Sequence, residues 1–175
     1  FGKVPEDVER FLEKNNKQLS DFDAICLHLP YPKLGLKGLN TLLETEADNA
    51  IKEKLSERFT ESILYSQRVG NIYTGSLFLG LLSLLENSTN LNSGDKIALY
   101  SYGSGAVAEI FSMTLVPGYE KQLKQDRFDE FNSRTRISIE EYEDMFFRDT
   151  TVDSEGNLDI SDIKDDSRFV LEKIE

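Results

Sequence analysis

The spacing of apolar residues divides the chain into alternating helical and extended segments. Residues 5–17 follow a helical pattern that places Val8, Phe11 and Leu12 on one face, and similar patterns cover about 34–48 and 51–68. Residues 74–86 are apolar nearly all round, which indicates a buried helix. The short apolar run at 22–29 is typical of a strand buried on both sides, and the runs at 96–102 and 106–116 are predicted to be strands as well. This alternation predicts an α/β fold.

Beyond Pro117 the segments become shorter, more polar and more acidic. Ser138 and Glu141 have the spacing of a capping box, which predicts a helix that ends near Arg148. An acidic loop follows at 149–166, and residues 168–174 have the pattern of a closing strand. We therefore expect one domain over 1–175, with 117–166 as a polar insertion of helix and loop.

Composition and charge narrow the class of protein. Apolar residues make up 39% of the chain and charged residues 30%, as in soluble globular domains. The net charge of -12 opposes nucleic acids and anionic lipids. The longest apolar run, at 77–85, is about half the roughly 20 residues that span a bilayer. A single cysteine excludes an internal disulfide and suits the cytoplasm, so we expect a cytoplasmic protein without a nucleic-acid or membrane partner.

His28 is the only histidine and stands near the end of the predicted strand at 22–29. Strand alternation places it on one face with Ala24 and Cys26. It is either a core residue or a ligand-binding group, because ligands of α/β sheets bind beyond the carboxyl ends of strands. Lys33 and Lys37 share one face of a helix that begins near Lys33, and form either a solvated surface or a cationic site for a phosphorylated ligand.

The segment 69–76 contains a second candidate. Gly70 and Asn71 end the preceding helix, and Thr74 or Ser76 is suited to capping the next one. Asn71 is therefore either a turn residue or a rigid amide that donates to a carbonyl and accepts from an imidazole.

The segment 101–106 contains a third. Gly103 and Gly105 flank Ser104 and allow the backbone to approach a ligand closely, so that exposed N–H groups there can form an oxyanion hole. The segment is not a nucleophile elbow, because Tyr102 stands where that motif requires glycine. Nor is it a dinucleotide-binding fingerprint, because position 108 is alanine.

The cysteine and the remaining potential metal ligands are not predicted to be functional. Cys26 lies within a strand without an adjacent base, which predicts a core thiol. Residues 151–162 resemble a calcium loop, but Thr151 and Asp162 occupy its first and last ligand positions. With one histidine and one cysteine in the chain, we expect no metal site.

Four segments together resemble the C-terminal half of 3-hydroxy-3-methylglutaryl-CoA (HMG-CoA) synthases of the bacterial, Gram-positive type. They are "FDAICLHLPYPKLGLKGL" (22–39), "VGNIYTGSLFLGLLSLLEN" (69–87), "LYSYGSGAVAEIFSMTLVPGY" (99–119) and "NSRTRISIEEYEDMFF" (132–147). Their order and spacing match as well, and the resemblance extends over nearly the whole chain. The first 17 residues and the loop at 149–166 match least well.

The resemblance implies a thiolase-like fold, here its C-terminal half with αβα layers, a mixed sheet and a small helical, acidic extension. It implies an acyltransferase that condenses acetyl-CoA with acetoacetyl-CoA in the mevalonate pathway of isoprenoid biosynthesis. The CoA thioesters are substrates, and no separate cofactor is expected. In such enzymes an acetylated cysteine supplies the acyl group and a glutamate removes its methyl proton. The resulting carbanion equivalent attacks the ketone of acetoacetyl-CoA, and hydrolysis releases the product.

The resemblance also implies roles for the candidate residues. His28 matches the active-site histidine, which orients the acetoacetyl group and polarises its carbonyl. Asn71 matches an asparagine that hydrogen-bonds in the same pocket. Ser104, between Gly103 and Gly105, matches the residue whose backbone N–H helps to hold the acetyl thioester oxygen.

Lys33 and Lys37 match positions along the CoA tunnel. The nucleophilic cysteine and the glutamate of the family belong to its N-terminal half, and Cys26 does not match the setting of that nucleophile. We therefore expect a C-terminal fragment, inactive alone, whose partner is the N-terminal half and whose full-length form is a homodimer; the absent initiator methionine fits this expectation. Two alternatives remain open: another thiolase-fold acyltransferase, such as a ketoacyl synthase or thiolase, and a non-catalytic CoA-binding or dimerisation module.

Overall fold

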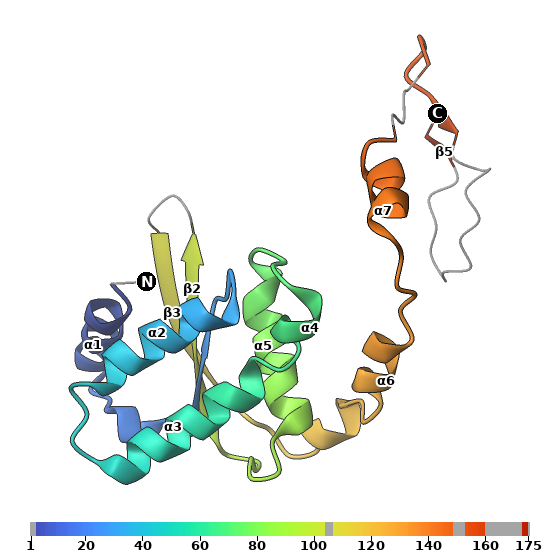
Figure 1. The fold of residues 1–175 in the computed structure, drawn as a ribbon. Helices are drawn as coiled ribbons and strands as arrows, with labels where there is room; N and C mark the ends of the chain where they lie inside the picture. Colours follow the sequence, from blue (N-terminus) through green and yellow to red (C-terminus); the bar gives the residue numbers. More distant parts are fainter. Residues whose placement is uncertain (1–2, 104–106, 149–152, 160–172, 175) are drawn as a thin grey trace. The chain divides into compact units, whose positions relative to one another are not determined.

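The computed structural model describes residues 3–103, 107–148, 153–159 and 173–174 (Figure 1). The chain forms two compact units, 1–131 and 132–175, and each is described by itself. Within the described ranges, no helix combines the length and the apolar character needed to cross a membrane.

A mixed sheet of three strands forms the centre of the first unit. Its order is β1 (Ala24–Leu27), β2 (Lys96–Gly103) and β3 (Val107–Thr114), with β1 parallel to β2 and β2 antiparallel to β3. Leu27 lies opposite Tyr100, so the carboxyl ends of β1 and β2 meet at the same edge of the sheet. The predicted α/β architecture with a mixed sheet is confirmed.

Helices cover both faces of this sheet (Figure 1). Ile25 and Leu27 pack into a core cluster with α1 (Val4–Asn15), α2 (Pro32–Leu43) and α3 (Asn49–Ser62). Ala24 and Cys26 pack on the opposite face against α5 (Gly75–Asn87), which follows the short α4 (Ser66–Val69). The alternation predicted for β1 is therefore confirmed.

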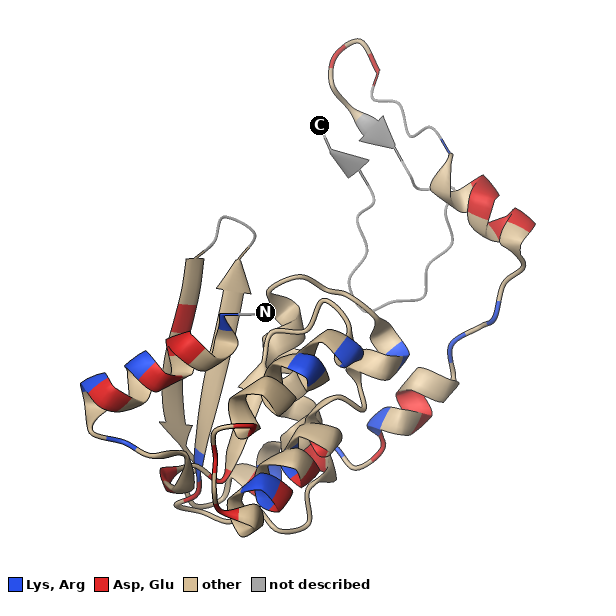
Figure 2. Cartoon of the chain, turned by 60° about the vertical axis from the view of Figure 1, so that its left-hand side comes forward, with Lys and Arg blue, Asp and Glu red and all other residues tan. Residues whose placement is uncertain are grey.

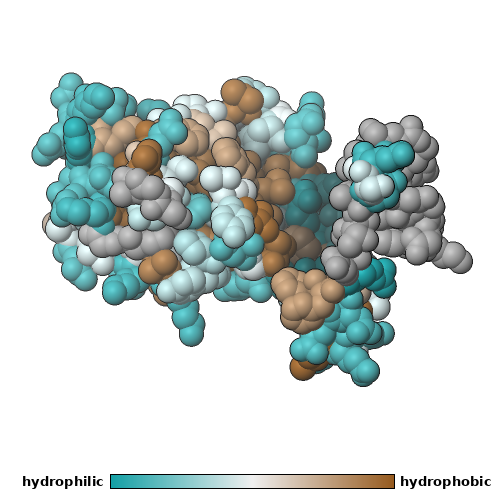
Figure 3. Space-filling model, turned by 90° about the horizontal axis from the view of Figure 1, so that it is seen from above, coloured by the Kyte–Doolittle hydropathy of each residue, from teal (hydrophilic) through white to brown (hydrophobic). Residues whose placement is uncertain are grey.

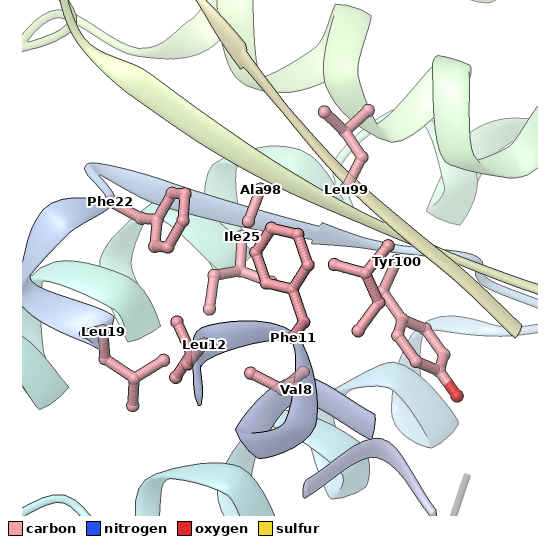
Figure 4. Close-up of a pocket in the computed structure, with 10 residues that line it drawn as sticks. Val8, Phe11, Leu12, Leu19, Phe22, Ile25, Ala98, Leu99 and Tyr100 are labelled. Atoms are coloured by element: carbon pink, nitrogen blue, oxygen red, sulfur yellow. The ribbon is translucent and has the colours of Figure 1, made fainter. Parts of the chain in front are cut away.

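A small apolar pocket lies between α1 and the sheet, on the face of Ile25 (Figure 4). Tyr100 is one of its lining residues, and the hydroxyl of Tyr100 donates a hydrogen bond to Asp7 at 2.9 Å and thereby joins β2 to α1. The pocket belongs to the hydrophobic core, and its lining residues are Val8, Phe11, Leu12, Leu19, Phe22, Ile25, Ala98, Leu99, Tyr100 and Ile110.

Helix α5 buries its small residues and leaves Phe78 exposed, which differs from the helix buried on all sides that the sequence predicted. A Cβ atom at Gly80 would stand 3.5 Å from the carbonyl oxygen of Ser62, so α3 and α5 approach closely there. The Ser83 hydroxyl donates to the carbonyl of Glu61 at 2.6 Å and accepts from the N–H of Tyr65 at 3.4 Å. Small side chains therefore allow close packing, and the hydroxyl satisfies backbone groups buried by it.

A buried carboxylate fastens the segment after the sheet to α5. Glu86 receives Nε and Nη2 of Arg127 at 2.5 and 2.8 Å, the hydroxyl of Tyr65 at 2.7 Å and the backbone N–H of Lys124 at 3.0 Å. Burial alone would raise the pKa of Glu86, but these hydrogen bonds outweigh it and hold the pKa below its usual value. Phe128 packs edge-on against the Tyr65 ring. Within the first unit, the network thus fastens Lys124 and the start of α6 (Arg127–Asn132), which follow the 3₁₀ turn Tyr119–Gln122, to α5.

In the second unit, Ser138 and Glu141 form the predicted capping box at the start of α7 (Ile139–Phe146). The Ser138 hydroxyl accepts the N–H of Glu141 at 3.1 Å, and the Glu141 carboxylate accepts the N–H of Ser138 at 2.7 Å. Acidic residues gather on α7 (Figure 2). Short strands β4 (Leu158–Asp159) and β5 (Lys173–Ile174) pair antiparallel, and the other residues of the strand predicted at 168–174 lie outside the described ranges.

We expect Arg127→Ala to lower the free energy of unfolding by about 3 kcal/mol, because it leaves the buried Glu86 carboxylate without its cation. Urea unfolding followed by circular dichroism measures the change. Lys124→Ala is the matched control, because it removes only a partly exposed ion pair with Glu130 and should cost less than about 1 kcal/mol. Equal destabilisation by the two substitutions would contradict this account of the network.

Candidate active site

His28 follows β1 directly, at the edge where β2 also ends. Its backbone N–H donates to the carbonyl of Tyr100 at 2.8 Å, which extends the parallel pairing by one residue. The side chain is only 8% exposed and lies on the α5 side of the sheet, like that of Cys26. The chain then turns through Pro30 into α2, so the predicted end of the strand at the prolines is confirmed.

Ser76 lies in the first turn of α5. Its side chain contacts both His28 and Leu29, the residue that follows His28. The Ser76 hydroxyl is 3.3 Å from Nδ1 of His28, and it accepts the backbone N–H of Leu29 at 3.0 Å. Ser76 is fully buried. The sequence predicted a cap at Thr74 or Ser76, but neither side chain caps α5. Ser76 instead holds the turn that follows β1.

Burial lowers the pKa of the His28 imidazole below its ordinary value. The contact with the first turn of α5 acts in the same direction, because the amino-terminal end of a helix is positive and disfavours a cation. A pKa below the ordinary value of about 6.5 leaves the imidazole mostly neutral at pH 7. A neutral imidazole carries one proton and can donate one hydrogen bond from the nitrogen that holds it.

Because His28 is the only histidine, its titration can be followed as a single imidazole signal in proton NMR spectra. We expect a midpoint below the value of about 6.5 for an unperturbed histidine. The native state then binds fewer protons than the unfolded state between these two pKa values. The contribution of His28 to stability should therefore rise with pH across that window and become constant above it. The urea-unfolded chain is the control, and a folded midpoint at or above the unfolded one would contradict the expectation.

Cys26 lies in the middle of β1, on the same face as His28, and is completely buried. Burial raises the pKa of its thiol to about 12. At neutral pH the side chain is therefore a thiol with almost no nucleophilic thiolate. The structure thus agrees with its assignment as a core residue.

We expect Cys26 to resist alkylation by iodoacetamide at pH 8 in the folded chain and to react fully in denaturant. The chain has one cysteine, so intact-mass spectrometry counts the modification directly. Rapid alkylation of the folded chain would show that the thiol is accessible and would contradict its assignment to the core.

Lys33 and Lys37 both lie on α2, four residues apart, and both are exposed. The predicted shared face of a helix is thus confirmed. Between them, Gly35 faces inward, and a Cβ atom there would lie 2.2 Å from the side chain of Leu29. Glycine at position 35 therefore lets α2 pack closely on the residue that follows His28.

Asn71 lies in the exposed segment between α4 and α5. Its Oδ1 accepts the backbone N–H of Tyr73 at 2.8 Å, and Tyr73 has a positive φ of 54°. Asn71 therefore forms a turn, one of the two roles that its sequence allowed. Because Oδ1 is used in this way, the amide NH2 is the group left to donate to another molecule.

Gly103 ends β2 at the same edge of the sheet as His28, three positions beyond Tyr100 in the register. Ser104 and Gly105 lie outside the described residues. Figure 3 views this end of the first unit and shows hydrophobic side chains exposed among polar ones. Exposed apolar residues of the elements that meet here are Tyr31, Leu36, Ile72, Tyr73, Phe78 and Val107.

Comparison with known proteins identifies the family. Residues 40–158 match the sequence profile described as the C-terminal part of hydroxymethylglutaryl-coenzyme A synthase. The hydroxymethylglutaryl-CoA synthase of Enterococcus faecalis is 44% identical over 160 residues, which cover 91% of this chain and 41% of that enzyme. The chain belongs to the HMG-CoA synthase family. It spans about two fifths of the length of this relative.

Solved structures confirm the thiolase-like fold of the HMG-CoA synthases. The crystal structure of an HMG-CoA synthase complexed with CoA superposes on this chain with a TM-score of 0.86 at 50% identity. The superposed region covers 92% of this chain and 42% of the chain in that structure. The polyketide biosynthesis 3-hydroxy-3-methylglutaryl-ACP synthase of Bacillus subtilis is a more distant relative, 30% identical over 129 residues, which cover 71% of this chain and 32% of that enzyme. Asn71 and Gly103 lie within the matched profile, whereas His28 and the two lysines of α2 precede it.

Proposed function

We propose that this chain supplies the acceptor-substrate half of an HMG-CoA synthase that condenses acetyl-CoA with acetoacetyl-CoA in the mevalonate pathway. The observation that carries the proposal is the buried imidazole of His28, which contacts the hydroxyl of Ser76 at the carboxyl end of β1. The 44% identity to the Enterococcus faecalis enzyme supports CoA substrates over carrier-protein substrates, since identity to the Bacillus subtilis acyl-carrier-protein enzyme is 30%.

In this proposal the donor acetyl group is bound as a thioester to a cysteine of the N-terminal half. A glutamate of that half removes a methyl proton, and the carbanion equivalent forms a carbon–carbon bond with the ketone carbon of acetoacetyl-CoA. The electron pair of the ketone moves onto its oxygen, which then takes up a proton. The imidazole of His28 donates a hydrogen bond to this oxygen and stabilises its developing charge. Water finally cleaves the cysteine thioester to a carboxylate and a free thiol.

Other residues of the same edge bind the substrates. Lys33 and Lys37 present two ammonium groups on α2, which suits the phosphates or the pantetheine of CoA. The amide NH2 of Asn71 is available to a substrate carbonyl. The family resemblance assigns the backbone N–H of Ser104, between Gly103 and Gly105, to the thioester oxygen.

The N-terminal half of the enzyme is the proposed protein partner, in a homodimeric full-length form. Apolar side chains that a partner surface would cover support this part of the proposal. Phe78 of α5 is 58% exposed, and Val107 of β3 is 68% exposed. Exposed apolar groups of this kind mark interaction sites when they form a contiguous patch.

The test uses an enzyme in which this chain is joined to the N-terminal portion of the Enterococcus faecalis relative. His28→Ala should lower the rate of condensation about 100- to 1,000-fold, because the ketone oxygen loses its hydrogen-bond donor. Acetylation of the N-terminal cysteine by radiolabelled acetyl-CoA should largely survive.

Cys26→Ala is the matched control, because Cys26 is buried on the same face of β1 and takes no part in the proposed chemistry. It should retain both acetylation and condensation. Loss of both activities in His28→Ala would contradict the role assigned to His28. An unsubstituted enzyme that is acetylated but does not condense acetoacetyl-CoA would overturn the proposed function itself.

A further inference from the structure

The contact between Ser76 and His28 involves one of the two ring nitrogens that can carry the imidazole proton. The Ser76 hydroxyl has one proton to donate and two lone pairs to accept with. One lone pair accepts the N–H of Leu29 at 3.0 Å, and Nδ1 of His28 lies 3.3 Å from the same oxygen. We infer that Ser76 is a positioning residue, whose hydroxyl donates to Nδ1 and so fixes the tautomer of His28 with the proton on Nε2.

The opposite arrangement would leave a buried proton without a partner. If Nδ1 carried the proton, it would donate to a hydroxyl oxygen that already accepts the N–H of Leu29. The hydroxyl proton of Ser76 would then need another acceptor. Among the described residues, Nδ1 is the acceptor that the structure provides for it. A fully buried hydroxyl proton without an acceptor is unfavourable, so the tautomer with the proton on Nε2 is preferred.

The position of Ser76 is itself fixed by the packing of α5. Seven residues further along the helix, on the same face, the hydroxyl of Ser83 bonds the backbone of Glu61 and Tyr65. Gly80, between the two serines, packs against the carbonyl of Ser62. Gly80 sets the close approach of α5, whereas the bonds of Ser83 lie two turns away from Ser76, so the short side chain of Ser76 presents its hydroxyl to the imidazole independently of them.

The consequence for catalysis rests on the proposed function. Nε2 is the nitrogen left to donate to the ketone oxygen of the acceptor, and the tautomer selected by Ser76 places the proton there in advance. Without Ser76, the neutral imidazole would exchange between two tautomers, and only one of them could stabilise the developing negative charge. Ser76 therefore acts on the reaction through His28, without contact to the substrate.

Nitrogen NMR of the full chain labelled with ¹⁵N-histidine tests the assignment, because the chain gives only one pair of ring-nitrogen signals. At a pH where the ring is neutral, we expect a protonated, pyrrole-type Nε2 and an unprotonated, pyridine-type Nδ1. Ser76→Ala should move both signals toward averaged values, and Ser76→Thr, which keeps the hydroxyl, should restore them. A protonated Nδ1 in the unsubstituted chain, or unchanged signals in Ser76→Ala, would overturn the inference.

Ser83→Ala is the matched control, because it removes a second fully buried hydroxyl from the same face of α5. It should leave the ring-nitrogen signals of His28 unchanged, which separates a specific effect on the tautomer from a general loosening of the helix. A shift in Ser83→Ala equal to that in Ser76→Ala would mean that helix packing, and not the hydroxyl of Ser76, sets the tautomer.

In the joined enzyme, Ser76→Ala should lower kcat for condensation about 10- to 100-fold, by analogy with the loss of partners that orient metal-binding histidines. Ser83→Ala should stay close to the unsubstituted enzyme. If the unsubstituted enzyme does not condense acetoacetyl-CoA, the proposed function fails while the NMR result still decides the tautomer. Full activity in Ser76→Ala with averaged ring signals would overturn the catalytic part of the inference.

Discussion

The close packing of α5 against β1 and α3 is the constraint on which the first unit depends. Ser76, Gly80 and Ser83 have side chains small enough to let the helix approach its neighbours. That approach buries backbone N–H and carbonyl groups, and the two serine hydroxyls bond some of them at once. The same contact that closes the core therefore also positions an imidazole at the edge of the sheet. One face of α5 therefore both packs the core and contacts the candidate active-site histidine.

Burial on the α5 side of the sheet affects the chemistry of Cys26 and His28 differently. Both Cys26 and His28 are kept neutral, since desolvation raises the pKa of a thiol and lowers that of an imidazole. A neutral thiol is a poor nucleophile, so Cys26 is unreactive. A neutral imidazole is still a hydrogen-bond donor and acceptor, so burial is compatible with the role proposed for His28. The same buried environment thus makes Cys26 unreactive and leaves His28 able to form hydrogen bonds.

The sequence predicts local elements well, because periodicity and turn residues act within a few positions. It identified β1, its end at the prolines, the shared face of Lys33 and Lys37, and the cap at Ser138. It missed the role of Ser76, because a serine near a helix start has the pattern of a cap whether or not it contacts a residue 48 positions away. It also gave no sign of the Glu86 network, since the pairing with Arg127 joins side chains 41 positions apart. Such partners are set by packing between elements, which local patterns do not encode.

The choice of a serine as the partner of His28 has its own chemical logic. A carboxylate against Nδ1 would instead accept a proton held on Nδ1 and leave Nε2 of the neutral ring without one, and its negative charge would raise the pKa of the imidazole and favour the cation. An imidazolium can transfer a proton to the substrate. A neutral ring with its N–H in a fixed place stabilises negative charge by a hydrogen bond and does not transfer the proton. A hydroxyl orients the ring and adds no charge, and the positive end of α5 beside it opposes protonation further. These features favour a residue that polarises a carbonyl over one that acts as a general base.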